Sequence, residues 1–313
     1  MAKFRDSASD ASNVVEAGDV EARPSALPAD DQGEVHDRSI GDIIRELRNL
    51  SAEQVESVLA YQREHGVRFG EAAVALRFVT QDDVLYALSQ QFHYPYAPEE
   101  QRKGSPELVA LNQPFSLQAE AFRALRSQVV MRVWGDKHPR SALAVISADH
   151  GDGKTFFAAN LAVALAQLGG GRTLLVDADL RSPRLHEVFK LDNRTGLSGI
   201  LSGRSDTDVI RQVPTVPSLF VLAAGTTPPN PLELVERPAF GLLMRELASK
   251  FDHIVVDTPA ASSGADASVI AARCGAAVVI ARKNESRVSS LQDLMASLAG
   301  SPARLAGVVV NEF

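Results

Sequence analysis

Short apolar runs alternate with amphipathic stretches from residue 142 onward. The apolar runs lie at 142–147, 173–179, 219–225, 253–259, 276–281 and 305–311. Segments between them, such as 154–168 and 237–250, have apolar residues at helical spacing. Near-continuous apolar strands separated by helices are typical of a mostly parallel sheet covered on both faces. The pattern therefore predicts an α/β domain, which we assign to residues 101–313.

Two stretches nearer the amino end repeat each other. Residues 41–62, GDIIRELRNLSAEQVESVLAYQ, align without a gap with residues 70–91, GEAAVALRFVTQDDVLYALSQQ. Such self-similarity indicates two copies of one supersecondary unit. In each copy a helix-starting Ser51 or Thr80 is followed three positions later by Gln54 or Asp83, which is the pattern of a capping box. We expect a small helical two-repeat domain over residues 38–100.

The first 37 residues differ in composition from the rest. They carry nine acidic and three basic side chains, a net charge of −6, whereas the whole chain carries −7. This segment shows no apolar periodicity, so it cannot bury enough apolar surface to offset its ordering entropy. We expect residues 1–37 to form a disordered acidic tail. The chain has no basic block, which argues against nucleic acid as a partner.

Cysteine content and hydropathy bear on the cellular compartment. The single cysteine, Cys274, excludes a disulfide framework and fits a reducing compartment. No apolar run approaches the roughly 18 residues of a spanning helix, and the amino end lacks the apolar core of a signal peptide. We therefore expect a soluble cytoplasmic protein.

The stretch SADHGDGKT, residues 147–155, follows the first apolar run and opens a helical segment. Backbone N–H groups at such a turn, together with the helix dipole, bind phosphate. Gly151, Asp152 and Gly153 form the turn, Lys154 is positioned to neutralise phosphates, and Thr155 offers a hydroxyl to Mg²⁺. Ala148 replaces the first glycine of the usual pattern, which the loop tolerates if Ala148 has a negative φ. This predicts a P-loop NTPase domain that binds ATP and Mg²⁺.

Acidic residues follow two of the later apolar runs. Asp177 ends LLVD and Asp179 follows two positions on, while Asp257 ends IVVD. The carboxyl ends of strands in open α/β sheets are where ligands bind. Because phosphates alone leave octahedral positions open, Asp177 and Asp257 are candidates, with Thr155, for holding Mg²⁺ directly or through water.

The phosphate loop and the two acidic motifs, taken together, resemble those of a known protein family. The loop GDGKT, the stretch LLVDADLR with Asp177, Asp179 and Arg181, and the later IVVDTP are similar to the three Walker motifs of bacterial tyrosine kinases. The segment GTTPPNPLEL and the helix EAFRALR resemble further elements of that family. With RFGEAA and YPY added, the chain from about residue 40 resembles exopolysaccharide chain-length determinant tyrosine kinases of the EpsG type.

The resemblance implies an activity and roles for these residues. It implies a protein-tyrosine kinase in which Lys154 and Thr155 bind ATP and Mg²⁺, Asp177 accepts the tyrosine proton, and Asp179 is a second acid. Arg181 is expected to contact phosphate or a neighbouring acid. The family works with a membrane-bound chain-length determinant protein, which would hold this chain at the inner membrane. It also implies a ring of subunits, joined through Glu120, Arg123 and Arg126 of EAFRALR.

The two-repeat segment resembles the small N-terminal domain of type II secretion and pilus ATPases. Some members of that family bind cyclic di-GMP through a motif with a second glycine in each repeat. Here Arg48 and Arg77 occupy those positions. A bulky side chain where the backbone would approach the ligand argues against cyclic di-GMP and favours a docking domain.

Two other functions remain as alternatives. Positioning ATPases of chromosomes and division sites share this fold, but they carry a lysine where this chain has Asp149, and a carboxylate cannot replace it. In the second alternative the chain is a non-catalytic adaptor whose nucleotide sets its docking state. All four tyrosines precede the phosphate loop in the sequence. We therefore expect no phosphorylation of a tyrosine-rich tail and prefer an acceptor on another protein to Tyr94 and Tyr96.

Overall fold

The computed structural model describes residues 39–91, 105–135, 140–204 and 209–312. The predicted acidic tail, the tyrosines Tyr94 and Tyr96, and the predicted boundary between the two domains at residues 100 and 101 lie outside the described residues. We call residues 39–91 the helical body and residues 105–312 the α/β body, and we describe each by itself.

The helical body consists of four short helices that enclose a small apolar core. They are α1 (Ile40–Arg48), α2 (Ala52–His65), α3 (Phe69–Ala75) and α4 (Gln81–Gln91). Ile44, Val58 and Ala87 are fully buried in that core. Leu59, the neighbour of Val58 on α2, is 37% exposed.

Both predicted capping boxes are present in the helical body. The Ser51 hydroxyl accepts from the Gln54 N–H at 3.2 Å, and the Gln54 side chain accepts from the Ser51 N–H at 2.9 Å. Thr80 and Asp83 make the same reciprocal pair, at 3.2 and 2.7 Å. Each box satisfies helix-end donors that have no partner within the helix. Each repeat therefore forms a pair of helices, and the second helix of each pair begins with a capping box.

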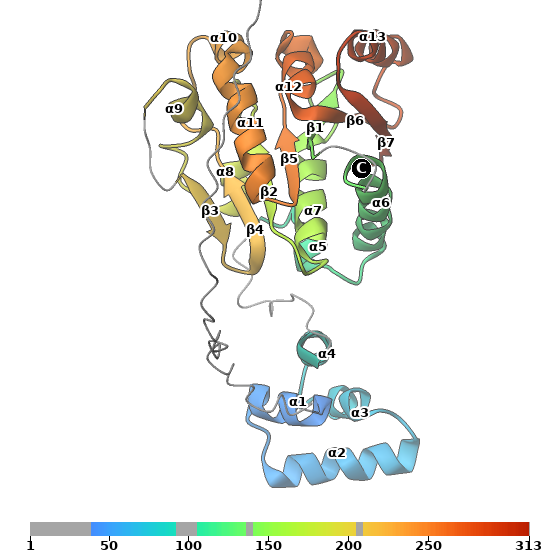
Figure 1. The fold of residues 1–313 in the computed structure, drawn as a ribbon. Helices are drawn as coiled ribbons and strands as arrows, with labels where there is room; N and C mark the ends of the chain where they lie inside the picture. Colours follow the sequence, from blue (N-terminus) through green and yellow to red (C-terminus); the bar gives the residue numbers. More distant parts are fainter. Residues whose placement is uncertain (1–38, 92–104, 136–139, 205–208, 313) are drawn as a thin grey trace, which may run out of the picture. The chain divides into compact units, whose positions relative to one another are not determined.

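A single seven-stranded sheet forms the centre of the α/β body (Figure 1). Its order is β3-β4-β2-β5-β1-β6-β7, and all neighbours are parallel except β3 and β4. The strands are β1 (Ala142–Ser147), β2 (Thr173–Asp177), β3 (Ile210–Val213), β4 (Val216–Leu222), β5 (His253–Asp257), β6 (Gly275–Arg282) and β7 (Arg304–Asn311). This confirms the predicted P-loop type of α/β fold with a mostly parallel sheet.

Helices cover both faces of this sheet, and each face has its own apolar core. One core contains side chains of α5 (Val109–Asn112), α6 (Leu117–Val133), α7 (Lys154–Ala166) and α8 (Leu185–Phe189). The other contains side chains of α9 (Leu197–Leu201), α10 (Pro231–Glu236), α11 (Pro238–Lys250), α12 (Asp266–Cys274) and α13 (Val288–Ala299). Because successive side chains of a strand point to opposite faces, Leu143 and Val145 join the first core while Ala144 and Ile146 join the second.

The strand predictions differ from the structure in three places. Strand β4 begins and ends three residues before the predicted run 219–225. The antiparallel edge strand β3 was not predicted, because its sequence IRQV is short and half exposed and lacks an apolar run. Strands β2 and β5 end at Asp177 and Asp257, two residues earlier than the apolar pattern suggested. None of the helices in the described ranges combines the length and apolar character needed to cross a bilayer.

Candidate nucleotide site

The loop between β1 and α7 has the geometry of a phosphate-binding loop. Gly151 and Gly153 have φ angles of 82° and 93°, which side chains with a Cβ rarely adopt. Ala148 is not among the residues with positive φ, so the missing glycine costs the turn nothing. Lys154 begins α7, and its Nζ donates to Ser147 Oγ at 3.0 Å and to the Asp149 carbonyl at 3.4 Å. The ammonium therefore lies across the loop, at a helix N-terminus.

Asp152 stabilises the phosphate loop through hydrogen bonds. Its carboxylate accepts from the Asp149 N–H at 3.0 Å and from the Ser286 hydroxyl at 2.7 Å. Its carbonyl accepts from Asn311 Nδ2 at 3.3 Å. Asp152 thus holds the loop against the chain that follows β6 through its side chain, and against the end of β7 through its backbone carbonyl.

Thr155 and Asp257 meet at the carboxyl end of the sheet. The Thr155 hydroxyl donates to Asp257 Oδ2 at 2.7 Å. Asp257 is fully buried, and its Oδ1 finds no hydrogen-bond donor among the described residues. Burial raises the pKa of Asp257 to about 7, against the opposing effects of Thr155 and Lys154. An unsatisfied buried carboxylate oxygen next to a hydroxyl is a suitable pair of ligands for a hard cation.

Asp177 and Asp179 have different surroundings although only one residue separates them. Asp177 is fully buried, and its two oxygens accept from the N–H groups of Asp179 at 3.2 Å and Leu185 at 3.1 Å. It pairs in register with Asp257, and burial followed by that neighbouring carboxylate raises the pKa of Asp177 well above its usual value. Asp179 lines the cavity and is 8% exposed. Asp177 therefore supports the turn, and Asp179 faces the open space.

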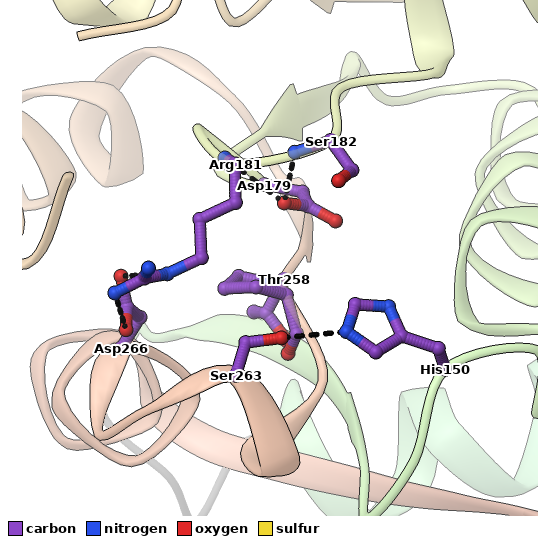
Figure 2. Close-up of polar contacts among 8 residues, drawn as sticks. His150, Asp179, Arg181, Ser182, Thr258, Ser263 and Asp266 are labelled. Carbon is purple, nitrogen blue, oxygen red and sulfur yellow. Dashed lines mark hydrogen bonds and ion pairs between the residues drawn. The ribbon is translucent and has the colours of Figure 1, made fainter. Parts of the chain in front are cut away.

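Two side-chain pairs tie the loop after β5 to the other two loops of the site (Figure 2). Arg181 binds Asp266 through Nε at 3.1 Å and a terminal nitrogen at 3.0 Å. The Ser263 hydroxyl lies 2.7 Å from His150 Nε2, and His150 belongs to the phosphate loop. Of the two partners expected for Arg181, phosphate or a neighbouring acid, the structure thus shows an acid.

The phosphate loop opens into a cavity of about 690 Å³. Lys154, Thr155 and Asp179 are among the residues that line it. Among the described residues no group of three or more His, Cys, Asp or Glu side chains converges as a metal site. Thr155 and Asp257 are placed to hold a cation together with phosphate and water oxygens, whereas both oxygens of Asp177, the third candidate, already accept backbone N–H groups.

Glu120, Arg123 and Arg126 lie on α6, as the sequence suggested. Arg123 binds Glu120 within the helix, with a closest distance of 2.6 Å, and also donates to the Pro114 carbonyl at 2.7 Å. Arg126 donates to the Ala164 carbonyl on α7 at 2.9 Å. Both arginines thus have internal contacts, whereas the Glu120 side chain is 67% exposed.

Several features of the site have no local sequence signal. Pro106, Glu107 and Val109, at and just before the short helix α5, line the cavity, and no motif marks them. Asp266, the partner of Arg181, lies 85 residues away in the chain. The sequence places His150 within the phosphate loop, but no sequence signal indicates its partner Ser263.

Comparison with known proteins shows the class of nucleotide-binding domain to which the α/β body belongs. The family model described as "CobQ/CobB/MinD/ParA nucleotide binding domain" matches residues 143–313, which is more than half of the chain. The α/β body is therefore a P-loop nucleotide-binding domain of this class.

Individual relatives narrow the class further. The chain is 32% identical over 204 residues to tyrosine-protein kinase YwqD of Bacillus subtilis, covering 65% of this chain and 85% of that protein. It is 28% identical to tyrosine-protein kinase Wzc of Salmonella typhi but spans only 28% of that protein's length. The kinase domain of Escherichia coli tyrosine kinase ETK superposes with a TM-score of 0.62 at 29% identity, over 68% of this chain and 82% of that one. The chain belongs to the bacterial tyrosine-kinase family.

Proposed function

We propose that this chain is an ATP-dependent protein-tyrosine kinase. The observation that carries the proposal is the convergence of Lys154, the hydrogen-bonded pair Thr155–Asp257 and Asp179 beside one cavity. Such a constellation supplies a phosphate anchor, a cation site and an acid facing the open space. Membership in the tyrosine-kinase family supports tyrosine as the acceptor.

In the proposed reaction the tyrosine oxygen forms a bond to the γ-phosphorus of ATP as the bond to the β-phosphate oxygen breaks. The hydroxyl proton goes to a carboxylate, and ADP leaves. Mg²⁺ supplies charge neutralisation for the phosphates when it is bound. Lys154 and the loop N–H groups would hold the phosphates, and Thr155 and Asp257 would hold the cation. Most of the acceleration in such reactions comes from positioning and charge neutralisation, and the base contributes less.

Two acids compete for the role of proton acceptor. The family resemblance assigns it to Asp177, whose oxygens both hold backbone N–H groups. Asp179 lines the cavity, and the protein donors to its side chain, the N–H groups of Arg181 and Ser182, both bind Oδ1. Because Asp179 faces the cavity, an incoming tyrosine hydroxyl would reach Asp179 before Asp177. Asp177 fixes the turn that carries Asp179.

The family resemblance also supports a cellular role. We propose that the kinase regulates exopolysaccharide chain length and export together with a membrane-bound chain-length determinant protein. That partner would hold the chain on the cytoplasmic side of the inner membrane. The exposed Glu120 carboxylate supports a ring in which it meets arginines of a neighbouring subunit.

A labelled-ATP assay tests the proposal. The purified full chain is incubated with labelled ATP and Mg²⁺, with and without the cytoplasmic part of the membrane partner, and phosphosites are mapped. We expect phosphotyrosine. Asp179→Asn should lower transfer at least about 100-fold with near-normal binding of a non-hydrolysable ATP analogue, because an amide cannot accept the proton. If Asp179→Asn transfers phosphate at the wild-type rate and Asp177→Asn transfers none, the proton acceptor is Asp177. Tight ATP binding without any phosphotyrosine would favour the adaptor function.

A further inference from the structure

The cavity continues beyond the phosphate loop along an apolar wall. Pro106, Val109 and Phe156 are the apolar side chains of its lining, which they share with Asp179 and with Lys154 of the phosphate loop. The ring of Phe156 packs edge-on against Phe122, with centroids 5.8 Å apart and planes at 61°. Phe122 itself is 7% exposed, so the wall is supported from behind. An aromatic and aliphatic wall of this kind suits the face of a planar ring.

The wall is attached to the helix that carries the phosphate-binding lysine. Asn160 of α7 is fully buried, and its Oδ1 accepts from the Ala110 N–H at 2.9 Å. Its Nδ2 donates to the carbonyl of Glu107 at 2.8 Å. These two bonds bind residues 107–110 to α7. A ring seated on the wall would therefore be held at a set position relative to Lys154.

The cavity lies on one flank of the phosphate loop. In the sheet order, β2 and β6 are on opposite sides of β1. Asp152 is bound on the β6–β7 flank, through Ser286 and Asn311. The cavity is lined instead by Asp179, Ser182 and Arg184, which follow β2. The acid that faces an acceptor hydroxyl is thus on the cavity side, which favours the acceptor over the adenine base as the occupant.

A charged pair lies among the cavity-lining residues. A terminal nitrogen of Arg184 contacts Glu107 Oε1 at 2.9 Å. The two side chains are 51% and 38% exposed. Because solvent screens an exposed ion pair, its net stability is small, and another carboxylate can replace Glu107 on the guanidinium at little cost. Arginine also binds carboxylates with a defined, often bidentate geometry.

We infer that this cavity is the acceptor site and selects a tyrosine with an acidic residue beside it. The phenol ring packs on Phe156 and Val109 with its hydroxyl toward Asp179, and the neighbouring carboxylate binds Arg184 in place of Glu107. This inference rests on the proposed kinase function and adds the chemical class of the acceptor. The acceptor is therefore an acidic tyrosine peptide on a protein surface.

Peptide binding tests the inference without requiring transfer. Two short peptides are compared, one with glutamates flanking a tyrosine and one with lysines in their place. Affinities for the full chain are measured by calorimetry with Mg²⁺ and a non-hydrolysable ATP analogue. We expect the acidic peptide to bind about tenfold more tightly. Arg184→Gln should remove this preference, and Glu107→Gln, which removes the competing carboxylate, should increase it. Arg194→Gln, another exposed arginine in an ion pair, is the matched control and should behave as wild type.

The outcomes separate this inference from the kinase function. An acidic preference that disappears in Arg184→Gln, together with phosphate transfer to the acidic peptide, supports the inference. If the preference is present but no phosphate is transferred, the cavity still recognises an acidic peptide, and it is the kinase proposal, and with it the acceptor role of the cavity, that fails. Transfer to both peptides with equal affinity overturns the inference and leaves the kinase proposal intact. Phe156→Ala provides an independent check, because it should weaken peptide binding several-fold. If it weakens ATP-analogue binding and spares the peptide, the wall holds the adenine base and the inference is wrong.

Discussion

At the scale of single residues, Lys154 is a buried cation whose surroundings anticipate a phosphate. It is 7% exposed, and burial lowers the pKa of its ammonium although the nearby carboxylates, with Asp257 first among them, act to raise it. Lys154→Met should weaken Mg-ATP binding at least tenfold, about 1.4 kcal/mol, because a charge-assisted contact with phosphate is lost. Calorimetry measures this change. Lys250→Met removes an exposed lysine bound to Glu246 and should have no effect. Equal affinity for Lys154→Met and wild type would refute the loop assignment.

Asp257 should make the stability of the nucleotide-free protein depend on pH. Its folded-state pKa is raised from 3.8 to about 7, mainly by burial. Stability from such a group is fully present below the unfolded pKa and is lost as pH rises through the folded pKa. Asp257→Asn removes the titrating group, so its thermal stability should exceed that of wild type by an amount that grows from about pH 4 to about pH 7 and then levels off.

Thermal unfolding of both proteins from pH 4 to pH 8.5 measures this difference. A constant offset between the two curves would contradict the raised pKa. Adding Mg²⁺ and an ATP analogue should favour wild type at high pH, because a divalent cation next to the carboxylate stabilises its charged form.

At the scale of elements, the two repeats of the helical body are joined by a charged contact. Arg48 at the end of α1 lies 2.9 Å from Asp83, the capping residue of α4. Burial acts to raise the pKa of Asp83, but hydrogen bonds from Arg48 and Thr80 lower it overall. Arg77, at the equivalent position of the second repeat, has a left-handed φ of 58°, a conformation that glycine adopts at less cost. The seventh position after the first glycine of each repeat is thus used differently in the two repeats.

Arg48→Ala should destabilise the helical body by about 1 kcal/mol, because the 4%-exposed Asp83 carboxylate loses its cation while the arginine is itself partly exposed. Hydrogen–deuterium exchange of peptides from residues 39–91 measures the effect locally. Arg45→Ala, on the same helix and exposed, is the matched control. Since the pKa of Asp83 is lowered on folding, its contribution is present near neutral pH and is lost as pH falls through that pKa. The difference between the variants should therefore vanish in acid.

At the scale of the whole molecule, the proposed ring depends on Glu120. Charge reversal of Arg123 or Arg126 would also break their hydrogen bonds to the Pro114 and Ala164 carbonyls. A loss of the oligomer in such a variant could then result from a disturbed fold and not from a lost subunit contact. Glu120→Lys is cleaner because this side chain is 67% exposed. With Mg-ATP, light scattering should show an oligomer for wild type and a monomer for Glu120→Lys. Glu246→Lys reverses another exposed helical carboxylate and should leave the mass unchanged. Equal masses for Glu120→Lys and wild type would exclude Glu120 as a subunit contact.

Some features of this protein were determined by the sequence alone, and they are the local ones. Apolar runs predicted six of the seven strands. A central strand buried on both faces, such as β1, needs continuous apolar residues, and the edge strand β7 has such a run although none of its residues is fully buried. The capping boxes at Ser51 and Thr80 were readable because both partners lie within one helical turn. The glycines of the phosphate loop were readable because their backbone conformation excludes most other residues.

Tertiary structure decided how these parts combine, because the deciding contacts join distant residues with no periodic signal between them. Thr155 and Asp257 are 102 residues apart, Arg181 and Asp266 are 85 apart, and Asn160 reaches 50 residues back to Ala110. Sequence marked Asp177 and Asp179 as a pair. Only the fold separates them, since the chain turns after β2 so that Asp177 holds backbone N–H groups and Asp179 faces the cavity. The spacing of two acids determines that they are neighbours, whereas the packing around them determines which one a substrate can reach.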